Sequence, residues 1–77
     1  MLTKEHIEIL RHTLGADGRV PGYRNYFAAD EEGDNYATIT ELVGMGLMQR
    51  GVTIPGGLIY FHVTEAGQDL IGVVAKK

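Results

Sequence analysis

The chain has 77 residues, of which 44% are apolar and 22% are charged, a composition typical of a globular domain with room for one hydrophobic core only. It contains no cysteine, which excludes disulfides, thiolate metal sites and thiol catalysis. Seven basic and ten acidic residues give a net charge of −3, so we expect no general attraction to nucleic acid or to anionic lipid.

No apolar run approaches the ~20 residues that a membrane-spanning helix needs, and no basic and apolar leader opens the sequence. We therefore expect a cytoplasmic protein with no membrane association. A domain this short is expected to be stable by only a few kcal/mol, on the order of 3 to 5. A partner, or a second copy of the chain in a homodimer, would add to that stability.

The first predicted element is an amphipathic helix over residues 3–14. Thr3 can cap its N-terminus, and apolar residues recur three and four positions apart as far as Leu14. Gly15 stands where a residue in the left-handed conformation commonly ends a helix. The aromatic-rich segment 23–27 follows a Pro-Gly pair, which favours a short strand.

The acidic turn 30–34 precedes a second predicted helix, over residues 35–45. We expect Asp34 to cap this helix and Gly46 to end it. Four apolar side chains share one face of the helix and are expected to be buried. They are Tyr36, Ile39, Leu42 and Val43.

Two further strands and a helix complete the prediction. Residues 47–50 and 58–63 are expected to form a β-hairpin around a loop that contains Pro-Gly-Gly. Thr64 can cap the last helix, whose expected buried face consists of Ala66, Leu70 and Ile71. The predicted fold is thus a single α+β domain over residues 1–77, with a small antiparallel sheet and the element order α-β-α-β-β-α.

The second half of the chain carries a resemblance to a known fold. Residues 42–48 (LVGMGLM), a hairpin, and residues 61–67 (FHVTEAG) succeed one another as the end of the recognition helix, the wing and the final helix do in winged-helix domains of the MarR and PadR types. This resemblance covers residues 34–72. It implies a winged-helix-like scaffold and, as in those regulators, binding to DNA.

The whole chain is also similar to short phage and prophage proteins. The residues that carry this second resemblance are Leu-Arg-His at 10–12, Tyr-Arg-Asn at 23–25 with Phe27, and Val-Thr-Glu-Ala-Gly at 63–67. It implies a phage or prophage origin and no particular activity.

Two departures from the winged-helix pattern weaken the DNA-binding interpretation. The interval 15–33 is too rich in glycine for the helix that such domains place there. The segment that corresponds to the recognition helix, residues 35–45, contains no Lys or Arg, whereas helices that enter a DNA groove need cations against the phosphates. Only three of its polar side chains could contact bases: Asn35, Thr38 and Thr40.

Two sets of candidate contact residues follow. The candidates for nucleic acid are Arg24, Asn25 and Arg50, with Arg11 or Arg19 completing a positive face; the alternative is that these arginines are solvated or paired with acids. The candidates for protein contact are aromatic residues and methionines, whose alternative role is to fill the core. They are Tyr26, Met45, Met48 and Tyr60.

The sequence offers few residues suited to catalysis or to binding a cofactor. The chain has no serine or cysteine, its three histidines lack the spacing of a helical metal pair, and the acidic turn is too short for a calcium loop. The glycine-rich pieces match neither a phosphate-binding loop nor a dinucleotide fingerprint. We therefore expect no cofactor and no enzymatic activity. The leading hypothesis is a protein-interaction module that binds a protein partner or itself, and the alternative is a DNA-binding regulator.

Overall fold

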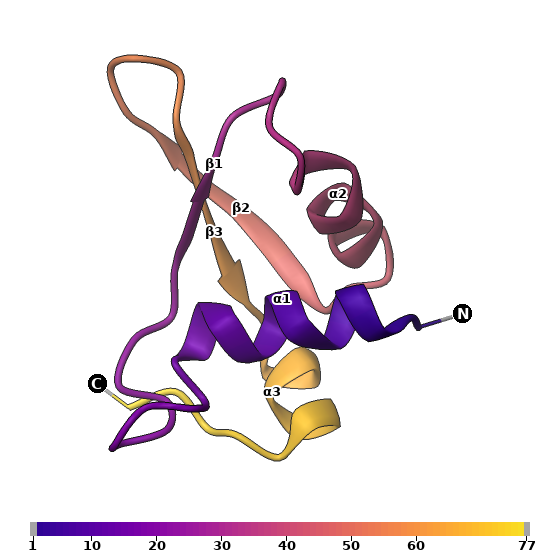
Figure 1. Cartoon of the computed structure of the whole chain (residues 1–77), viewed down its shortest axis with the longest axis vertical. Coiled ribbons are helices and arrows are strands. Elements are labelled where there is room, and N and C mark those ends of the chain that lie inside the picture. Colours follow the sequence, from indigo (N-terminus) through magenta and orange to yellow (C-terminus); the bar gives the residue numbers. More distant parts are fainter. Residues whose placement is uncertain (1, 77) are drawn as a thin grey trace.

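The elements follow one another in the predicted order α-β-α-β-β-α along residues 2–76, the part of the chain that the computed structural model describes (Figure 1). This α+β arrangement is compatible with a winged-helix-like class. The elements are α1 (Lys4–Leu14), β1 (Phe27–Ala29), α2 (Tyr36–Gly44), β2 (Met48–Thr53), β3 (Ile59–Val63) and α3 (Glu65–Ile71).

The sheet is antiparallel, with β3 in the middle and β1 and β2 at its two edges. Phe27 of β1 lies opposite Phe61 of β3, and Met48 of β2 lies opposite Val63. The register between β2 and β3 shifts between Arg50 and Thr53, as a β-bulge does. The loop that joins these two strands projects from one end of the molecule (Figure 1).

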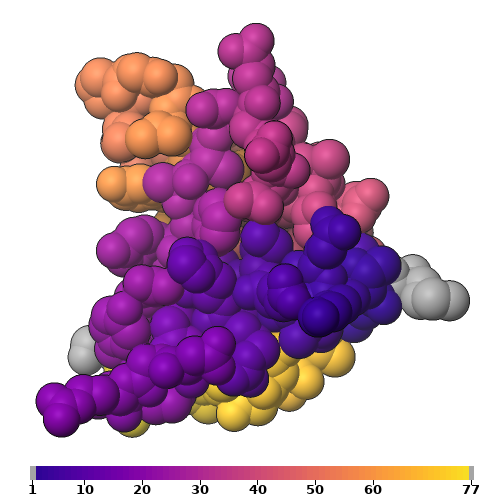
Figure 2. Space-filling view, in the orientation of Figure 1, coloured from indigo at the N-terminus to yellow at the C-terminus, as the bar shows by residue number. Residues whose placement is uncertain are grey.

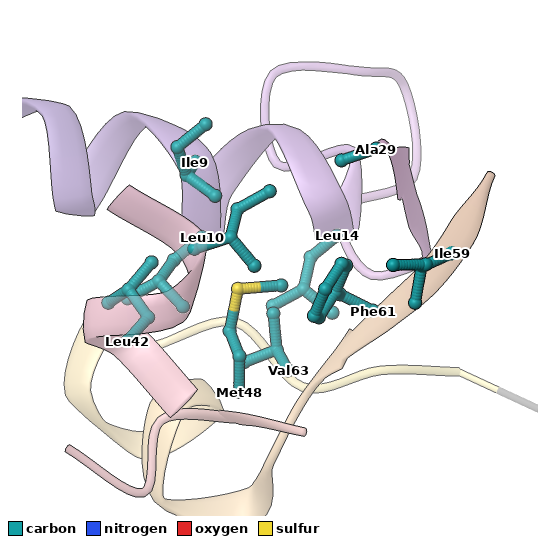
Figure 3. Close-up of a cluster of buried hydrophobic side chains, with 10 residues drawn as sticks. Ile9, Leu10, Leu14, Ala29, Leu42, Met48, Ile59, Phe61 and Val63 are labelled. Carbon is teal, nitrogen blue, oxygen red and sulfur yellow. The ribbon is translucent and has the colours of Figure 1, made fainter. Parts of the chain in front are cut away.

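One face of the sheet, which we call the inner face, carries the hydrophobic core. Alternate residues of β3 point into it, together with Met48, and α1 and α2 pack their apolar sides against it (Figure 3). Burial of each large aliphatic or aromatic side chain contributes about 1.5–3 kcal/mol. The cluster consists of Ile9, Leu10, Leu14, Ala29, Ile39, Leu42, Met48, Ile59, Phe61 and Val63.

The loop after α1 satisfies the last four carbonyl groups of that helix. Those of residues 11–14 would otherwise lack intrahelical partners, and each accepts a backbone N–H from the loop. The donors are Ala16, Gly15, Tyr26 and Gly22, which bond the carbonyls of Arg11, His12, Thr13 and Leu14, respectively.

This bonding accounts for an error in the predicted strand. We expected residues 23–27 to be extended into the sheet, but β1 begins only at Phe27. Residues 23–26 are held against the end of α1 and the end of β3 instead. The prediction that Thr3 caps α1 is confirmed, because its side chain accepts the His6 N–H. The prediction that Gly15 ends the helix is also confirmed, because Gly15 has a φ of 63°.

The predicted Asp34 cap of α2 is wrong. Asn35 occupies the N-cap position, has helical backbone angles and makes no side-chain cap bond. Backbone turns replace the cap, since the Tyr36 N–H donates to the Gly33 carbonyl at 3.3 Å. The C-terminal prediction is confirmed: Gly46 has a φ of 77°, and the Leu47 N–H donates to the Leu42 carbonyl as in a Schellman motif.

The hairpin and α3 form where expected, but the buried face of α3 differs from the prediction. Thr64 caps the helix through the Gly67 N–H. Ala66 and Leu70 are exposed, Leu70 to 47%, and Gly67 is buried in their place. A Cβ at Gly67 would overlap the Leu47 carbonyl oxygen, so the helix approaches the chain before β2 through its glycine. Of the three predicted side chains, Ile71 does pack against the core, where it is partly buried.

Candidate functional site

Arg24 is bound to the end of α1. Its Nε and Nη2 donate to the His12 carbonyl at 3.1 and 2.6 Å, and its Nη1 donates to the Tyr23 hydroxyl at 2.9 Å. The guanidinium also lies 5.3 Å from the centre of the Tyr23 ring. A cation that bonds the last carbonyls of a helix stabilises it. Arg24 would have to give up these bonds to reach a phosphate.

Asn25 serves as part of the sheet. Its side-chain amide donates to the Val63 carbonyl at 3.0 Å, and its Oδ1 accepts the Val63 N–H at 2.7 Å. The amide thus pairs with β3 just before β1 begins, as a strand backbone would. Both ends of the amide are thus engaged with β3, and contact of Asn25 with a base stays a prediction.

The DNA alternative predicts a positive face of Arg24, Arg50 and one of Arg11 or Arg19; Arg19 is exposed in the loop after α1, but the other members lie apart or are paired. Arg50 is exposed on β2, whereas Arg24 precedes β1 at the opposite edge, so about 10 Å of sheet separates the two edges. Arg11 forms an ion pair with Asp17 at 2.6 Å. The exposed surface of α2 presents Glu41 and no cation, and the acidic turn 30–34 stands at its N-terminus.

The second face of the sheet, which we call the outer face, is defined by Tyr26, Ala28, Gln49, Tyr60 and His62. Ala28 lies opposite Tyr60, and Gln49 lies opposite His62, so these side chains share one face. The rings of Tyr26 and Tyr60 pack 5.9 Å apart, and Tyr26 is 51% exposed. The outer face carries no Asp, Glu, Lys or Arg.

Hydrogen bonds hold the outer face in place and leave polar groups on it. His62 Nδ1 donates to the Asn25 carbonyl at 2.6 Å, because a carbonyl can only accept. Nε2 is then the ring nitrogen that remains for an outside partner. Within residues 2–76, the hydroxyls of Tyr26 and Tyr60 have no protein partner, so the face combines apolar area with groups that can donate and accept.

The two methionines predicted as contact residues lie in different environments. Met48 is 2% exposed and lies in the core against Val63, so its prediction as a contact residue is wrong; its side chain points to the inner face. Met45 is 41% exposed at the end of α2, on the helix side of the sheet. The structure therefore brings together Tyr26 and Tyr60 and places Met45 elsewhere.

His6 forms a link between α1 and α2 that the sequence did not predict. Its ring is buried, and its Nδ1 accepts the Thr3 N–H at 2.9 Å. Nε2 therefore carries the proton and donates to Glu41 Oε1 at 2.7 Å. The available signal was the position of His6 three residues after the Thr3 cap, where the Glu of a capping box usually stands.

Three comparisons with known proteins gave no relative of this chain: a scan against protein-family models found no match, and neither did searches of curated proteins and of solved structures.

Among residues 2–76, no three His, Asp or Glu side chains gather closely enough to hold a metal ion. No helix in that range has the length and apolar character needed to cross a membrane.

Proposed function

We propose that this chain is a non-enzymatic protein-interaction module of phage or prophage origin, which binds a protein partner through the outer face of its sheet. The observation that carries the proposal is the packed pair of Tyr26 and Tyr60 on an uncharged face that no helix covers. Protein interfaces are enriched in tyrosine and depleted of charge at their centres. A self-complex is the same proposal with a second copy as the partner.

The two rings are suited to binding because they are already ordered. Tyr60 is fixed by its strand, and Tyr26 is fixed by the bond from its N–H to the Thr13 carbonyl at 3.2 Å. A tyrosine has only two side-chain torsions, so it presents a large amphipathic area at a small entropic cost. The neighbouring Ala28 has a small side chain, so the surface between the two rings and the sheet edge stays open.

The resemblance to winged-helix regulators supports DNA binding as the alternative. Its remaining candidates are Arg50 and Arg19, which are exposed and have no acidic partner among residues 2–76. One cation on the hairpin is few for a groove-binding protein, since phosphate contacts supply much of the affinity. The charge distribution therefore favours a protein partner.

The interaction proposal is tested by selecting binders from a random displayed peptide library and then comparing two variants. Tyr60→Ser removes one ring from the outer face, and Leu70→Ser removes an apolar side chain that is 47% exposed on α3. We expect Tyr60→Ser to weaken the selected binders about tenfold or more and Leu70→Ser to change them little. Equal effects of the two substitutions would refute the proposal.

The DNA alternative is tested by titrating the chain against a labelled random duplex at low and at moderate salt. Binding that falls steeply with salt and is lost in Arg50→Ala would establish the regulator and displace our proposal. The mass of the chain in solution, recorded at the same concentrations, decides whether a second copy is the partner.

A further inference from the structure

The direction of the backbone groups along β3 determines which edge atoms of β1 are free. Val63 turns its N–H and C=O toward Asn25, that is, toward the β1 side. In an antiparallel ladder these directions alternate, so Phe61 and Ile59 also turn theirs toward β1. Their partners Phe27 and Ala29 therefore make the ladder bonds, and Ala28 between them turns its N–H and C=O away from the sheet.

The free edge begins where α1 ends. The Tyr26 N–H points the same way as that of Ala28, and it is bonded to the Thr13 carbonyl of α1. Alternation along β3 leaves the N–H and C=O of Ala28 outside the ladder, and within residues 2–76 no turn or loop group bonds them. The opposite edge, β2, is protected by the charge of Arg50 and by its bulge, two devices that discourage strand addition. The edge of β1 has neither.

Two hollows lie along this free edge. One, of about 150 Å³, is lined by Tyr26, Phe27 and Ala28 together with His12 and the cation Arg24. The other, of about 420 Å³, lies between α1 and Phe27 and includes Ile9 in its wall. An extended chain beside β1 would point alternate side chains to opposite faces. The residue opposite Ala28 would reach the outer face beside Tyr26, and its neighbour would enter the larger hollow.

The charges at the open end of the edge indicate the partner's composition. Beyond Ala29 the chain continues into the acidic turn 30–34, which carries four carboxylates and no cation. A hollow of about 490 Å³ separates this turn from Gly56 and Gly57 of the hairpin loop, and it appears as the notch between the two projections in Figure 2. A segment beside Ala28 therefore meets negative charge at this end and Arg24 at the other, so its own cations are expected at the end beside the acidic turn.

We propose that the β1 edge accepts an extended basic segment of a partner protein as a fourth strand. The backbone of the segment bonds the N–H and C=O of Ala28, an apolar or aromatic side chain packs beside Tyr26, and Lys or Arg lies against the acidic turn. This inference rests on the proposed function and names the way in which the partner binds.

Ala28→Pro is the sharpest test, because it removes the free N–H and leaves the ladder bonds of Phe27 and Ala29 in place; proline is tolerated on edge strands in this orientation. Ala28→Ser keeps the N–H and is the matched control. With the peptides selected from the random library, we expect Ala28→Pro to weaken binding about tenfold or more and Ala28→Ser to change it less than about twofold. We also expect those peptides to be enriched in Lys and Arg at one end.

Amide hydrogen exchange gives a second measurement on the unsubstituted chain, which decides the matter if Ala28→Pro does not fold. The Ala28 amide should exchange much faster than those of Phe27 and Ala29 in the free chain and become protected when a selected peptide binds. Unchanged exchange at Ala28, or undiminished binding by folded Ala28→Pro, would overturn the inference. If Tyr60→Ser still weakens binding in that case, the outer face remains the site; if it does not, the proposed function fails as well.

Discussion

The two faces of the sheet differ more than any other pair of regions in this molecule. On β3, Ile59, Phe61 and Val63 are between 1% and 3% exposed, whereas Tyr60 and His62, which alternate with them, are only half-buried. The three helices contribute to the inner side or to its ends, and none covers the outer face. The inner face thus provides the folding free energy, and the outer face keeps aromatic side chains free for contact.

This division is notable in so short a chain. A domain of this size buries only about 60% of the surface that its unfolded form exposes. Leaving two tyrosines on the open face reduces the stability that burial could provide. The comparison therefore predicts that substitutions on the inner face change stability strongly, and that substitutions on the outer face change binding.

The largest effect is expected for Phe61→Ala on the inner face. Removing a fully buried ring costs about 3–5 kcal/mol, which is similar to the whole stability of a domain this small. We expect the variant to be mostly unfolded at 25 °C in circular dichroism and to show no cooperative transition in urea. A cooperative transition at the midpoint of the unsubstituted chain would mean that the inner face is not the main source of stability.

Asn25→Ala tests the edge at which the two faces meet. It leaves the N–H and C=O of Val63 without partners and removes the bonds of 2.7 and 3.0 Å, at a cost of about 2–3 kcal/mol. Asn35→Ala is the control, because the Asn35 side chain makes no cap bond. Urea unfolding of the two variants measures the difference, and similar midpoints would show that the Asn25 amide does not hold the sheet.

Gly67→Ala tests the closure of the inner face by α3. The added methyl group would overlap the Leu47 carbonyl oxygen, so we expect a loss of about 2 kcal/mol. At the end of α2, by contrast, nothing lies within 4 Å of a Cβ at Gly44. Gly44→Ala should stabilise the chain by about 0.5–1 kcal/mol. Thermal unfolding of both variants measures the two signs, and a stabilised Gly67→Ala would contradict the close approach.

The smallest loss of stability is expected for Tyr60→Ser on the outer face. The ring is half-buried and makes one aromatic contact, with Tyr26, so its loss should cost about 1 kcal/mol. The same variant should weaken the selected binders about tenfold or more. A loss of stability as large as that of Phe61→Ala, measured in the same urea series, would remove the distinction between the two faces.

The sequence predicted the elements whose determinants lie close together in the chain. The cap at Thr3, the apolar spacing of α2, the Pro-Gly-Gly loop and the cap at Thr64 are all local patterns, and each gives the element that was expected. The candidate site was only partly predictable for the same reason. Alternation along β3 was visible, but it does not say which face the helices will cover.

The errors arise where a side chain bonds a distant part of the chain. Asn25 pairs with Val63, 38 positions away, and Arg24 bonds His12, 12 positions away, so neither role follows from the aromatic segment that contains them. Met48 was a candidate for contact because of its flexible thioether, with core filling as the alternative, and it fills the core. The free edge at Ala28 depends on the strand order, which the sequence did not specify.

The bonded loop after α1 has a consequence for how the molecule opens. Residues 15–26 contain neither helix nor strand, yet their N–H groups occupy every terminal carbonyl of α1. The loop cannot detach without exposing those carbonyls, so it and the last turn of α1 form one cooperative unit in local unfolding. The glycine-rich segment is therefore expected to be as resistant to local unfolding as the end of α1. A protease should cut it only as fast as that end of the helix opens.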